Sequence, residues 1–319
     1  MSTTMTAPDK TVTPTHRNAV ASQPTPSAWR RFTRFCGDSL VPWLCKFMLW
    51  AWGIFNIGLL VWVIMTSFKS TSEILLGPFA LPSKIEWDNY VTAWTVAGFG
   101  QATLATLVFV GATLIIVLAV STPAAYALAR MTGRGADRLT YYFALGIALP
   151  MQSVLIPFFL MNTSFGMFMV DWVTGVWDPR IGLIILYSAT AIPWTVFILT
   201  AFFKSLPASL EEAAALDGAG PWTTFRRIML PLAKGPLTTV AMITAIGAWN
   251  ETLLVLVLVP DGALRTLPAA LLNMYYSLQY TSNWGALFAG VVLVIGPIVL
   301  LYAWAGRRIV EGATMGAVK

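Results

Sequence analysis

Long apolar stretches alternate with short polar segments along this chain. Six stretches hold about 20 mostly apolar residues each, the length that an α-helix needs to cross a hydrocarbon layer roughly 30 Å thick. They cover residues 47–65, 102–125, 141–159, 181–203, 237–259 and 284–305. Because a helix satisfies its own backbone groups, it can cross lipid where irregular chain cannot. The pattern predicts an all-α integral membrane protein with six transmembrane helices.

The positive charges are distributed unevenly over the polar segments. With the N-terminus inside the cell, sixteen of the twenty Lys and Arg residues fall in inner segments, and four fall in outer loops. The four are Lys69, Lys84, Arg180 and Arg265. Inner loops of membrane proteins carry such an excess. Both termini and the loop 204–236 are therefore predicted to be cytoplasmic, in a multi-pass protein of the inner or plasma membrane.

The composition supports a membrane protein and offers no sign of an enzyme. Only 11% of the residues are charged, 57% are apolar, and the mean hydropathy is +0.71, outside the range of soluble domains. The net charge of +6 reflects topology, so we expect no nucleic-acid partner. No phosphate-binding Gly-x-x-x-x-Gly-Lys-Ser/Thr loop, nucleophile elbow or His/Cys cluster occurs, so we expect no catalysis, cofactor or metal on this chain. Cys36 and Cys45 fall near the cytoplasmic face, where thiols stay reduced.

The two ends of the chain are expected to differ from the apolar middle. Residues 1–28 contain much Thr, Ser and Pro and few large apolar side chains, which predicts disorder. Arg and aromatic residues then alternate up to residue 35, as in a segment that lies on membrane lipid. We therefore expect a cytoplasmic N-terminal segment over 1–40, the first transmembrane helix with an external loop over 41–100, a membrane core over 101–308, and a cytoplasmic tail over 309–319.

The polar segment 204–236 is predicted to form two short helices. Ser209 and Glu212 have the spacing of a capping box, in which the Ser hydroxyl and the Glu carboxylate each accept a backbone N–H. Gly218 can take the left-handed conformation that ends a helix. Pro221 suits the first position of a second helix, and Pro231 is expected to end it. The simplest interpretation is an amphipathic hairpin on the membrane surface with no partner.

The residue spacing in this segment points to a more specific interpretation. It reads Glu212-Ala213-Ala214, three residues, Gly218, nine residues, Ile228, one residue, Leu230-Pro231. This resembles the EAA signature of ABC importer permeases at every defining position. The resemblance implies a type I ABC importer permease fold, in which 204–236, hereafter the coupling loop, docks into a groove of an ATPase subunit. It implies that Glu212 pairs with a basic residue there and that Gly218 permits the bend. The expected ATPase-coupling residues are Glu211, Glu212, Ala213, Ala214, Asp217, Gly218, Leu230 and Pro231.

Three further segments resemble the carbohydrate members of that family, closest to the maltose-type permease. They are Thr66-Ser67-Phe68-Lys69, Trp249-Asn250-Glu251 and Gly316-Ala317-Val318-Lys319. The resemblance implies a second, non-identical permease, two ATPase subunits that bind ATP and Mg²⁺, an extracellular or periplasmic solute-binding protein, and a disaccharide or oligosaccharide as cargo. The chain departs from the pattern in the Trp-rich segment 171–178 and in 98–102, which lacks the usual Asn-Ser. Both departures weaken any inference about the particular sugar.

Asn250 and Glu251 are candidates for the substrate pathway. A carboxylate in mid-bilayer costs roughly 2.5–3.5 kcal/mol, so it usually faces protein or water. On a continuous helix over 237–259, Gly247, Asn250, Glu251 and Leu254 would share one face. That face could line the pathway. A structural hydrogen bond or ion pair to a neighbouring helix explains the same residues equally well.

Aromatic and hydroxyl residues on the fourth predicted helix form a second candidate group. Tyr187, Thr190 and Trp194 share one face, and Pro193 interrupts the backbone beside them. Aromatic faces suit the C–H faces of sugars, and hydroxyl groups suit their OH groups. Packing or anchoring at the membrane interface is the alternative for such a stripe. Gln152, between two prolines of the third run, is a further candidate.

Two other functions fit parts of the sequence. The same transporter could carry glycerol phosphate, a polyamine or an amino acid, although Glu251 argues against an anionic cargo because a buried carboxylate repels it. An ion-coupled secondary transporter or a channel belongs to a different class. Secondary transporters usually contain inverted repeats with paired broken helices, and the sequence shows no duplicated pattern.

Overall fold

The computed structural model describes residues 41–173 and 177–315. The chain divides into two compact units, residues 1–59 and 60–319, and the packing described below lies within the second. The sequence predictions for residues 1–40, for the centre of the Trp-rich segment at 174–176 and for the C-terminal Gly316-Ala317-Val318-Lys319 fall outside the described residues.

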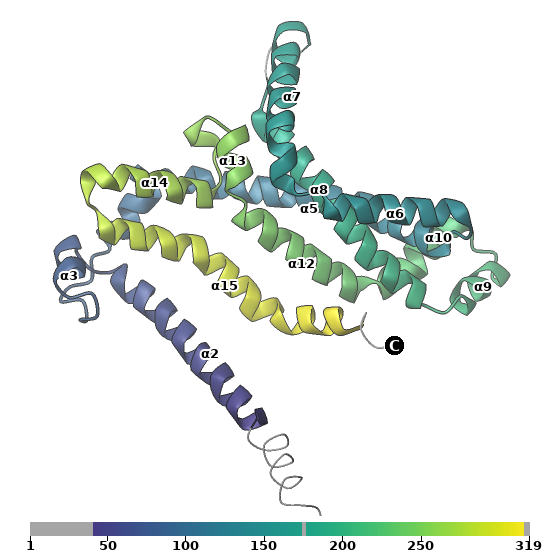
Figure 1. The fold of residues 1–319 in the computed structure, drawn as a ribbon, viewed down its shortest axis with the longest axis horizontal. Helices are drawn as coiled ribbons and strands as arrows, with labels where there is room; N and C mark the ends of the chain where they lie inside the picture. The colour runs from purple at the N-terminus through teal and green to yellow at the C-terminus, as the bar shows by residue number, and fades with distance from the viewer. Residues whose placement is uncertain (1–40, 174–176, 316–319) are drawn as a thin grey trace, which may run out of the picture. The chain divides into compact units, whose positions relative to one another are not determined.

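Within the described residues the regular structure is helical throughout (Figure 1), which confirms the all-α prediction. The long helices are α2 (Val41–Thr66), α5 (Phe99–Arg130), α6 (Arg134–Ala148), α7 (Met151–Trp172), α8 (Pro179–Ser205), α12 (Lys234–Asn250), α14 (Leu267–Thr281) and α15 (Trp284–Met315). The short ones are α3 (Thr71–Leu76), α4 (Asp88–Val91), α9 (Ser209–Leu216), α10 (Pro221–Thr224), α11 (Leu230–Leu232) and α13 (Leu253–Leu258), with π turns η2 (Thr92–Val96) and η3 (Phe225–Met229) and the 3-10 turn η4 (Gly262–Leu264).

Four of the six predicted spans are single helices. The runs 47–65, 102–125, 181–203 and 284–305 lie inside α2, α5, α8 and α15. Five helices of the described chain are long and apolar enough to cross a membrane. A sixth span results if Pro221–Leu232 and Lys234–Asn250, which meet at a bend of 73°, count as one broken helix. The described chain therefore has five spans, or six with the bent pair, which is consistent with the prediction, while two of the predicted boundaries differ.

The predicted third span, 141–159, is two helices and not one. Helix α6 ends at Ala148, Leu149 is extended (φ −74°, ψ 116°), and α7 begins at Met151. Pro150 explains the break, because proline has no N–H to donate and disfavours helical geometry in the residue before it. The apolar helix of this region is Met151–Asp171, which lies further along the chain than predicted.

The predicted fifth span, 237–259, is also broken. Helix α12 ends at Asn250, and Glu251 is extended (φ −68°, ψ 117°). The carboxylate Oε1 of Glu251 accepts the backbone N–H of Leu254 at 2.9 Å, which satisfies one free amide at the start of α13. Gly247, Asn250, Glu251 and Leu254 therefore do not share a single helix face, and that part of the prediction is wrong.

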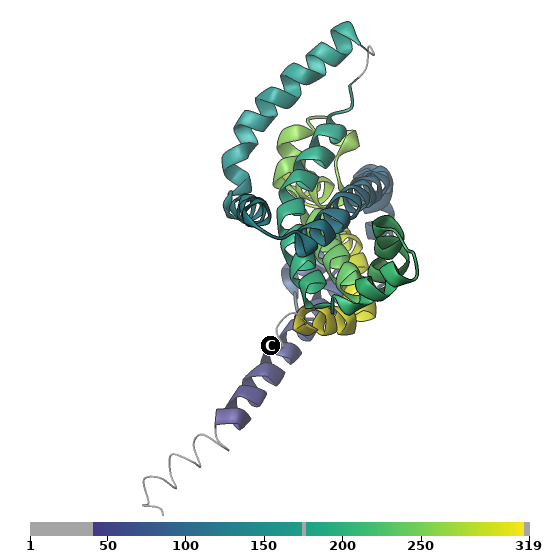
Figure 2. The ribbon, with the colours of Figure 1, turned by 90° about the vertical axis from the view of Figure 1, so that its right-hand side faces the viewer.

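The second unit is built around α5 and α8, which pack along each other. Helix α6 lies against α8. Helix α12 lies between the α5–α8 pair and α15. Figures 1 and 2 show this group from two sides, with α7 leaving it beside α8 and α13. In the described part of the chain, buried apolar side chains gather in three clusters, of which one lies beneath the coupling loop and joins α5, α8 and α12.

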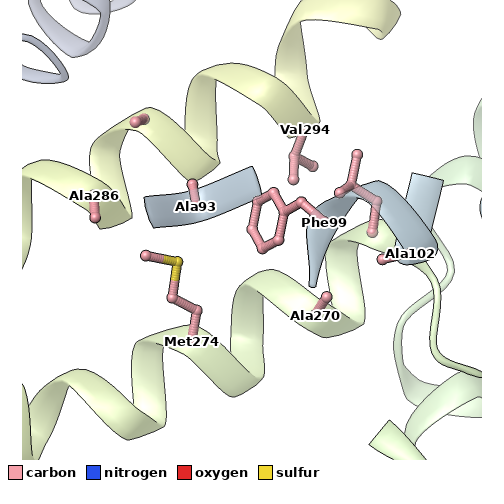
Figure 3. Packing of buried hydrophobic residues seen from close by; sticks show 9 residues of the cluster. Ala93, Phe99, Ala102, Ala270, Met274, Ala286 and Val294 are labelled. Carbon is pink, nitrogen blue, oxygen red and sulfur yellow. The ribbon is translucent and has the colours of Figure 1, made fainter. Parts of the chain in front are cut away.

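At the end of the unit away from the coupling loop, small side chains allow α5, α14 and α15 to approach one another closely. Figure 3 shows Phe99 at the start of α5 packed against α14 and α15, within a cluster in which five of nine residues are alanine. Small residues are typical of membrane helix contacts, where van der Waals packing replaces the hydrophobic effect. At Gly290 of α15 an added Cβ would lie 3.1 Å from the Phe99 ring. A side chain at Gly290 would therefore push the Phe99 ring by a few tenths of an ångström.

The Thr66-Ser67-Phe68-Lys69 segment has a structural role. The Lys69 side chain is fully buried, and its Nζ donates to the carbonyl oxygens of Gly77 and Pro78 at 3.2 and 3.0 Å. Asn89 Nδ2 donates to the Lys69 carbonyl at 2.9 Å. Ser70 and Glu73 form a capping box at the start of α3, and hydrogen bonds to the Glu73 carboxyl, first from the Ser83 hydroxyl, hold its pKa below the usual value.

Asp178 and Trp177 end the Trp-rich segment in defined contacts. The Asp178 carboxylate caps α8 by accepting the N–H of Arg180, and its bond to the Arg180 side chain lowers the pKa of the carboxyl. The Trp177 ring meets Phe165 edge-on at 5.2 Å. At Gly166 an added Cβ would lie 2.6 Å from Trp177. The described part of this segment therefore packs back on α7 and fixes the start of α8.

Candidate coupling loop and transport pathway

The coupling loop contains the two predicted short helices. Helix α9 runs from Ser209 to Leu216, and the second helix runs through α10, η3 and α11 to Leu232. Gly218 has φ +78°, the left-handed conformation expected of it. Its N–H donates to Ala215 at 3.0 Å, and the N–H of Ala219 donates to Ala214 at 2.9 Å. These two bonds form a Schellman motif, which ends α9 and satisfies its last carbonyls.

The predicted capping box of α9 is absent. Ala208, and not Ser209, precedes the first helical residue, and no side chain caps this end. Pro207 accepts the N–H of Leu210, and Ala208 accepts those of Glu211 and Glu212. The fixed φ of proline prepares this first turn. Ala208 is then already in helical geometry, and the Ser209 hydroxyl cannot act as the cap.

Pro231 does not end the second helix. Pro221 opens it as predicted, but the helix continues through Pro231 to Leu232 and bends by 73° only where α12 begins. In a regular α-helix the Pro231 ring would press on the carbonyl four residues earlier. The π turn η3, in which the N–H of Leu230 donates to Phe225, widens the helix just before the proline. The prediction missed this way of accommodating proline.

The two helices of the coupling loop differ in exposure. Ala214 is the buried residue of α9, whereas Glu212, Ala213, Asp217 and Gly218 are exposed. Leu216 leaves 90% of its surface uncovered. In the second helix Phe225 and Met229 are 5% and 0% exposed, within the cluster that joins α5 and α8. Leu230 is partly buried, and Pro231 is exposed.

Glu211, the remaining predicted coupling residue, faces the bundle. Its Oε1 accepts a hydrogen bond from Nε of Arg130, the last residue of α5, at 2.7 Å. Both side chains are about one-quarter exposed, at 23% each. The role of Arg130 was not predictable from the sequence, because the two residues are 81 positions apart and a single Arg at the end of an apolar run carries no signal of its partner.

The structure brings three of the six predicted pathway residues together. Tyr187, Thr190 and Trp194 line a cavity of about 380 Å³ with residues of α6, α7 and α12. Asn250 and Glu251 are not among its lining residues. Asn250 Nδ2 instead donates to the Ile246 carbonyl at 2.8 Å, and Glu251 caps α13. Gln152 is exposed in the first turn of α7 and lies outside the cavity lining.

The cavity wall combines aromatic, hydroxyl and small residues. Its lining consists of Gly146, Ile147, Leu149, Met151, Tyr187, Thr190, Ala191, Trp194, Ile243, Thr244 and Gly247, with no charged side chain among them. Tyr187 is held edge-on by Phe109 at 5.6 Å. An added Cβ on Gly247 would lie 2.6 Å from the Tyr187 hydroxyl, so a larger residue here would displace the Tyr187 side chain. A volume in the range of roughly 300–1,000 Å³ is usual for a small-molecule site.

The chain is similar in sequence to a family of transport proteins. Residues 121–311, which include the coupling loop and the cavity lining, match the family described as binding-protein-dependent transport system inner membrane component. The match covers the part of the chain that carries both candidate sites.

Three curated proteins are similar over most of their length. The diacetylchitobiose uptake system permease protein NgcG of Streptomyces coelicolor is 37% identical over 85% of this chain and 87% of its own. The trehalose transport system permease protein SugB of Mycobacterium tuberculosis is 35% identical over 81% and 91%. The multiple sugar-binding transport system permease protein MsmG of Streptococcus mutans is 35% identical over 84% and 93%.

A solved structure shares the fold. It is a chain in the crystal structure of a bacterial ABC transporter involved in the import of the acidic polysaccharide alginate, with a TM-score of 0.68 and 22% sequence identity. The similarity covers 89% of this chain and 99% of that one. The arrangement of helices described above is therefore that of an ABC importer permease, as the resemblance in sequence implied.

Proposed function

Because this chain belongs to the family of binding-protein-dependent transport system inner membrane components, we propose that it is the permease subunit of an ATP-driven importer of sugars. Its partners are a second, non-identical permease, two ATPase subunits that bind ATP and Mg²⁺, and a solute-binding protein outside the membrane. The chain provides the path and the attachment for the ATPase, and the partner hydrolyses ATP.

The exposed face of α9 is the observation that carries this proposal. Glu212, Ala213 and Leu216 are exposed on a short helix that ends in a left-handed glycine. An unpaired, exposed carboxylate next to small and apolar side chains suits a partner surface with a basic residue beside an apolar groove. When ATP binding closes the two ATPases, their movement displaces α9. The helices of the permease then change between inward-facing and outward-facing states, since each state is stabilised by different contacts.

The chemistry of the cavity favours a neutral sugar as cargo. A charged ligand in an apolar, partly enclosed site needs a counter-charge, and the cavity lining has none. Glycerol phosphate, polyamines and amino acids all carry charge, so this site does not favour them. Tyr187 and Trp194 provide flat faces for the C–H side of a sugar ring, and the hydroxyl groups of Tyr187, Thr190 and Thr244 provide hydrogen bonds. The names of the relatives, diacetylchitobiose and trehalose permeases, favour a disaccharide or oligosaccharide.

Uptake in cells that lack the ATPase partner tests the transporter class. We expect uptake of labelled disaccharide by the complete complex to stop when the ATPase subunit is removed, and to stop in the Glu212→Ala variant although the permease remains in the membrane. Uptake that continues without the ATPase and follows an ion gradient would contradict the proposal and favour a secondary transporter.

The pathway residues are tested by a matched pair of tyrosine variants. Tyr187→Phe removes one hydroxyl from the cavity wall, whereas Tyr141→Phe removes one from a side chain that is 72% exposed elsewhere on the unit. We expect Tyr187→Phe to raise KM for sugar uptake about fivefold, the usual loss for one hydrogen bond of about 1 kcal/mol, and Tyr141→Phe to leave KM unchanged. Equal KM values for both variants would remove Tyr187 from the pathway.

A further inference from the structure

Arg130 occupies the junction of three elements at the coupling loop. While its Nε donates to Glu211 of α9 at 2.7 Å, its Nη1 donates to the carbonyl of Phe203 at 2.9 Å and its Nη2 to that of Leu206 at 3.4 Å. Phe203 belongs to the last turn of α8, and Leu206 caps that helix. One guanidinium therefore connects the ends of α5 and α8 with the start of α9. The planar fork of Arg suits such multiple bonding better than the single ammonium of Lys.

The ion pair differs from two others that the structure defines. Lys84–Glu86 and Asp178–Arg180 join residues two positions apart, so they hold only local geometry. Arg130–Glu211 joins residues 81 apart. It also lies beside an aromatic group, since Tyr126, one turn before Arg130, packs against Phe203 at 5.6 Å and Phe225 at 5.1 Å.

Few other contacts hold α9 in place. Ala214 is its buried residue, and its neighbours along the chain are exposed on both sides. An alanine contributes little contact area, so the Glu211 carboxylate, bound by Arg130 and lying beside the Tyr126 hydroxyl, is a large part of the attachment. A half-buried pair of this kind is screened less by water and salt than a surface pair.

We infer that Arg130 and Glu211 form the internal link through which a displacement of α9 reaches the ends of α5 and α8, while the adjacent Glu212 remains free for the ATPase. The two adjacent glutamates then have separate tasks. Glu211 positions α9 within the chain and touches neither cargo nor nucleotide. This inference depends on the proposed function, and it assigns Glu211 to a different task from the one that the sequence implied.

Exchange of the two charges tests the link. Arg130→Glu and Glu211→Arg each place two like charges at the junction, so we expect each to lower sugar uptake by the full complex about tenfold or more, with ATP hydrolysis retained and no longer dependent on cargo. The double variant Arg130→Glu/Glu211→Arg restores the ion pair between α5 and α9 but not the two bonds to the Phe203 and Leu206 carbonyls, so we expect it to recover part of the lost uptake. Arg134→Glu, a change of the same charge on an exposed neighbour, should keep uptake within about twofold.

Hydrogen exchange gives a readout that does not depend on transport. In Arg130→Gln we expect backbone amides of α9 to exchange at least tenfold faster, while amides of 225–233, held by apolar burial, keep their protection. Unchanged exchange in α9, or failure of the charge exchange to restore any uptake, would overturn the inference. Glu212→Ala separates this failure from that of the proposed function. Normal uptake in Glu212→Ala contradicts the transporter coupling itself, whereas lost uptake there with no rescue by the double variant contradicts only the internal link.

Discussion

Helix α9 and the segment from α10 to α11 belong to one loop, yet they are attached to the bundle in different ways. The second segment buries Phe225 and Met229 in the cluster between α5 and α8. Helix α9 buries only Ala214 among its residues and is connected by the polar bond between Arg130 and Glu211. The difference indicates that the second segment is part of the folded core, while α9 is largely exposed and is linked to the core by charge, as the proposed contact with a partner requires.

This comparison separates stability from coupling. Removal of an apolar side chain from the second segment should unfold or loosen the permease, because it leaves a cavity. Changes in the exposed part of α9 should leave the folded unit intact and interrupt the contact with the ATPase. The following variants test that separation, from the largest expected effect on stability to the smallest.

Phe225→Ala should have the largest effect on stability. Truncation of a buried aromatic side chain costs about 3–5 kcal/mol, and Phe225 is 5% exposed. We expect a clearly lower thermal midpoint for the purified permease in detergent and less protein in the membrane. Trp222→Ala provides the control, since Trp222 lies on the same helix and is 65% exposed. Equal loss in both variants would mean that burial does not distinguish the two positions.

Gly218→Val should cause a moderate loss of stability and a complete loss of uptake. A β-branched residue at φ +78° costs about 1–3 kcal/mol, and relief of that strain would change the direction in which the chain leaves α9. No atom would lie within 4 Å of the added Cβ, so the effect comes from the backbone and not from a clash. Gly220→Ala is the matched control, because Gly220 has φ −72° and the same open space. We expect normal uptake of labelled sugar for Gly220→Ala. Equal uptake by the two variants would contradict a role for the left-handed conformation of Gly218.

Leu216→Ser should have the smallest effect on stability. The Leu216 side chain is 90% exposed, and exposed substitutions usually change stability by less than about 0.5 kcal/mol. We nevertheless expect weaker binding of the ATPase subunit, measured as the amount that copurifies with the permease, because an apolar contact is lost at the interface. An unchanged thermal midpoint with unchanged copurification would place Leu216 outside the contact surface.

Local sequence signals predict much of the fold. Contacts between residues far apart in the sequence are the part that they do not predict. The spans in α2, α5, α8 and α15 were recognisable from length and hydropathy alone. Gly218 and Pro221 were predictable because their backbone preferences act within a few residues. The break at Pro150 followed the same kind of rule but was hidden within a long apolar run. At Glu251 the backbone leaves α12, and the carboxylate caps α13. Apolar periodicity cannot show where one helix ends and the next begins within an apolar run.

The candidate sites show the same limit. The spacing of Glu212, Ala213, Ala214 and Gly218 is enough to predict a coupling loop, since a motif lies within one segment; its contact with an ATPase stays a prediction. The common face of Tyr187, Thr190 and Trp194 followed from helical geometry, and these three do line one cavity. The link of Arg130 with Glu211 and the close approach of Gly247 to Tyr187 join different helices. Such contacts depend on how the helices pack, which one sequence does not specify.

Cross-linking from α9 in the assembled transporter tests the central claim most directly. A permease with Cys36→Ser, Cys45→Ser and Leu216→Cys carries one thiol, to which a short photo-activated cross-linker is attached. We predict a covalent product with the ATPase subunit, more abundant with ATP than without it. Absence of that product, together with labelling of Leu216→Cys by a membrane-impermeant thiol reagent added outside the cell, would contradict the account.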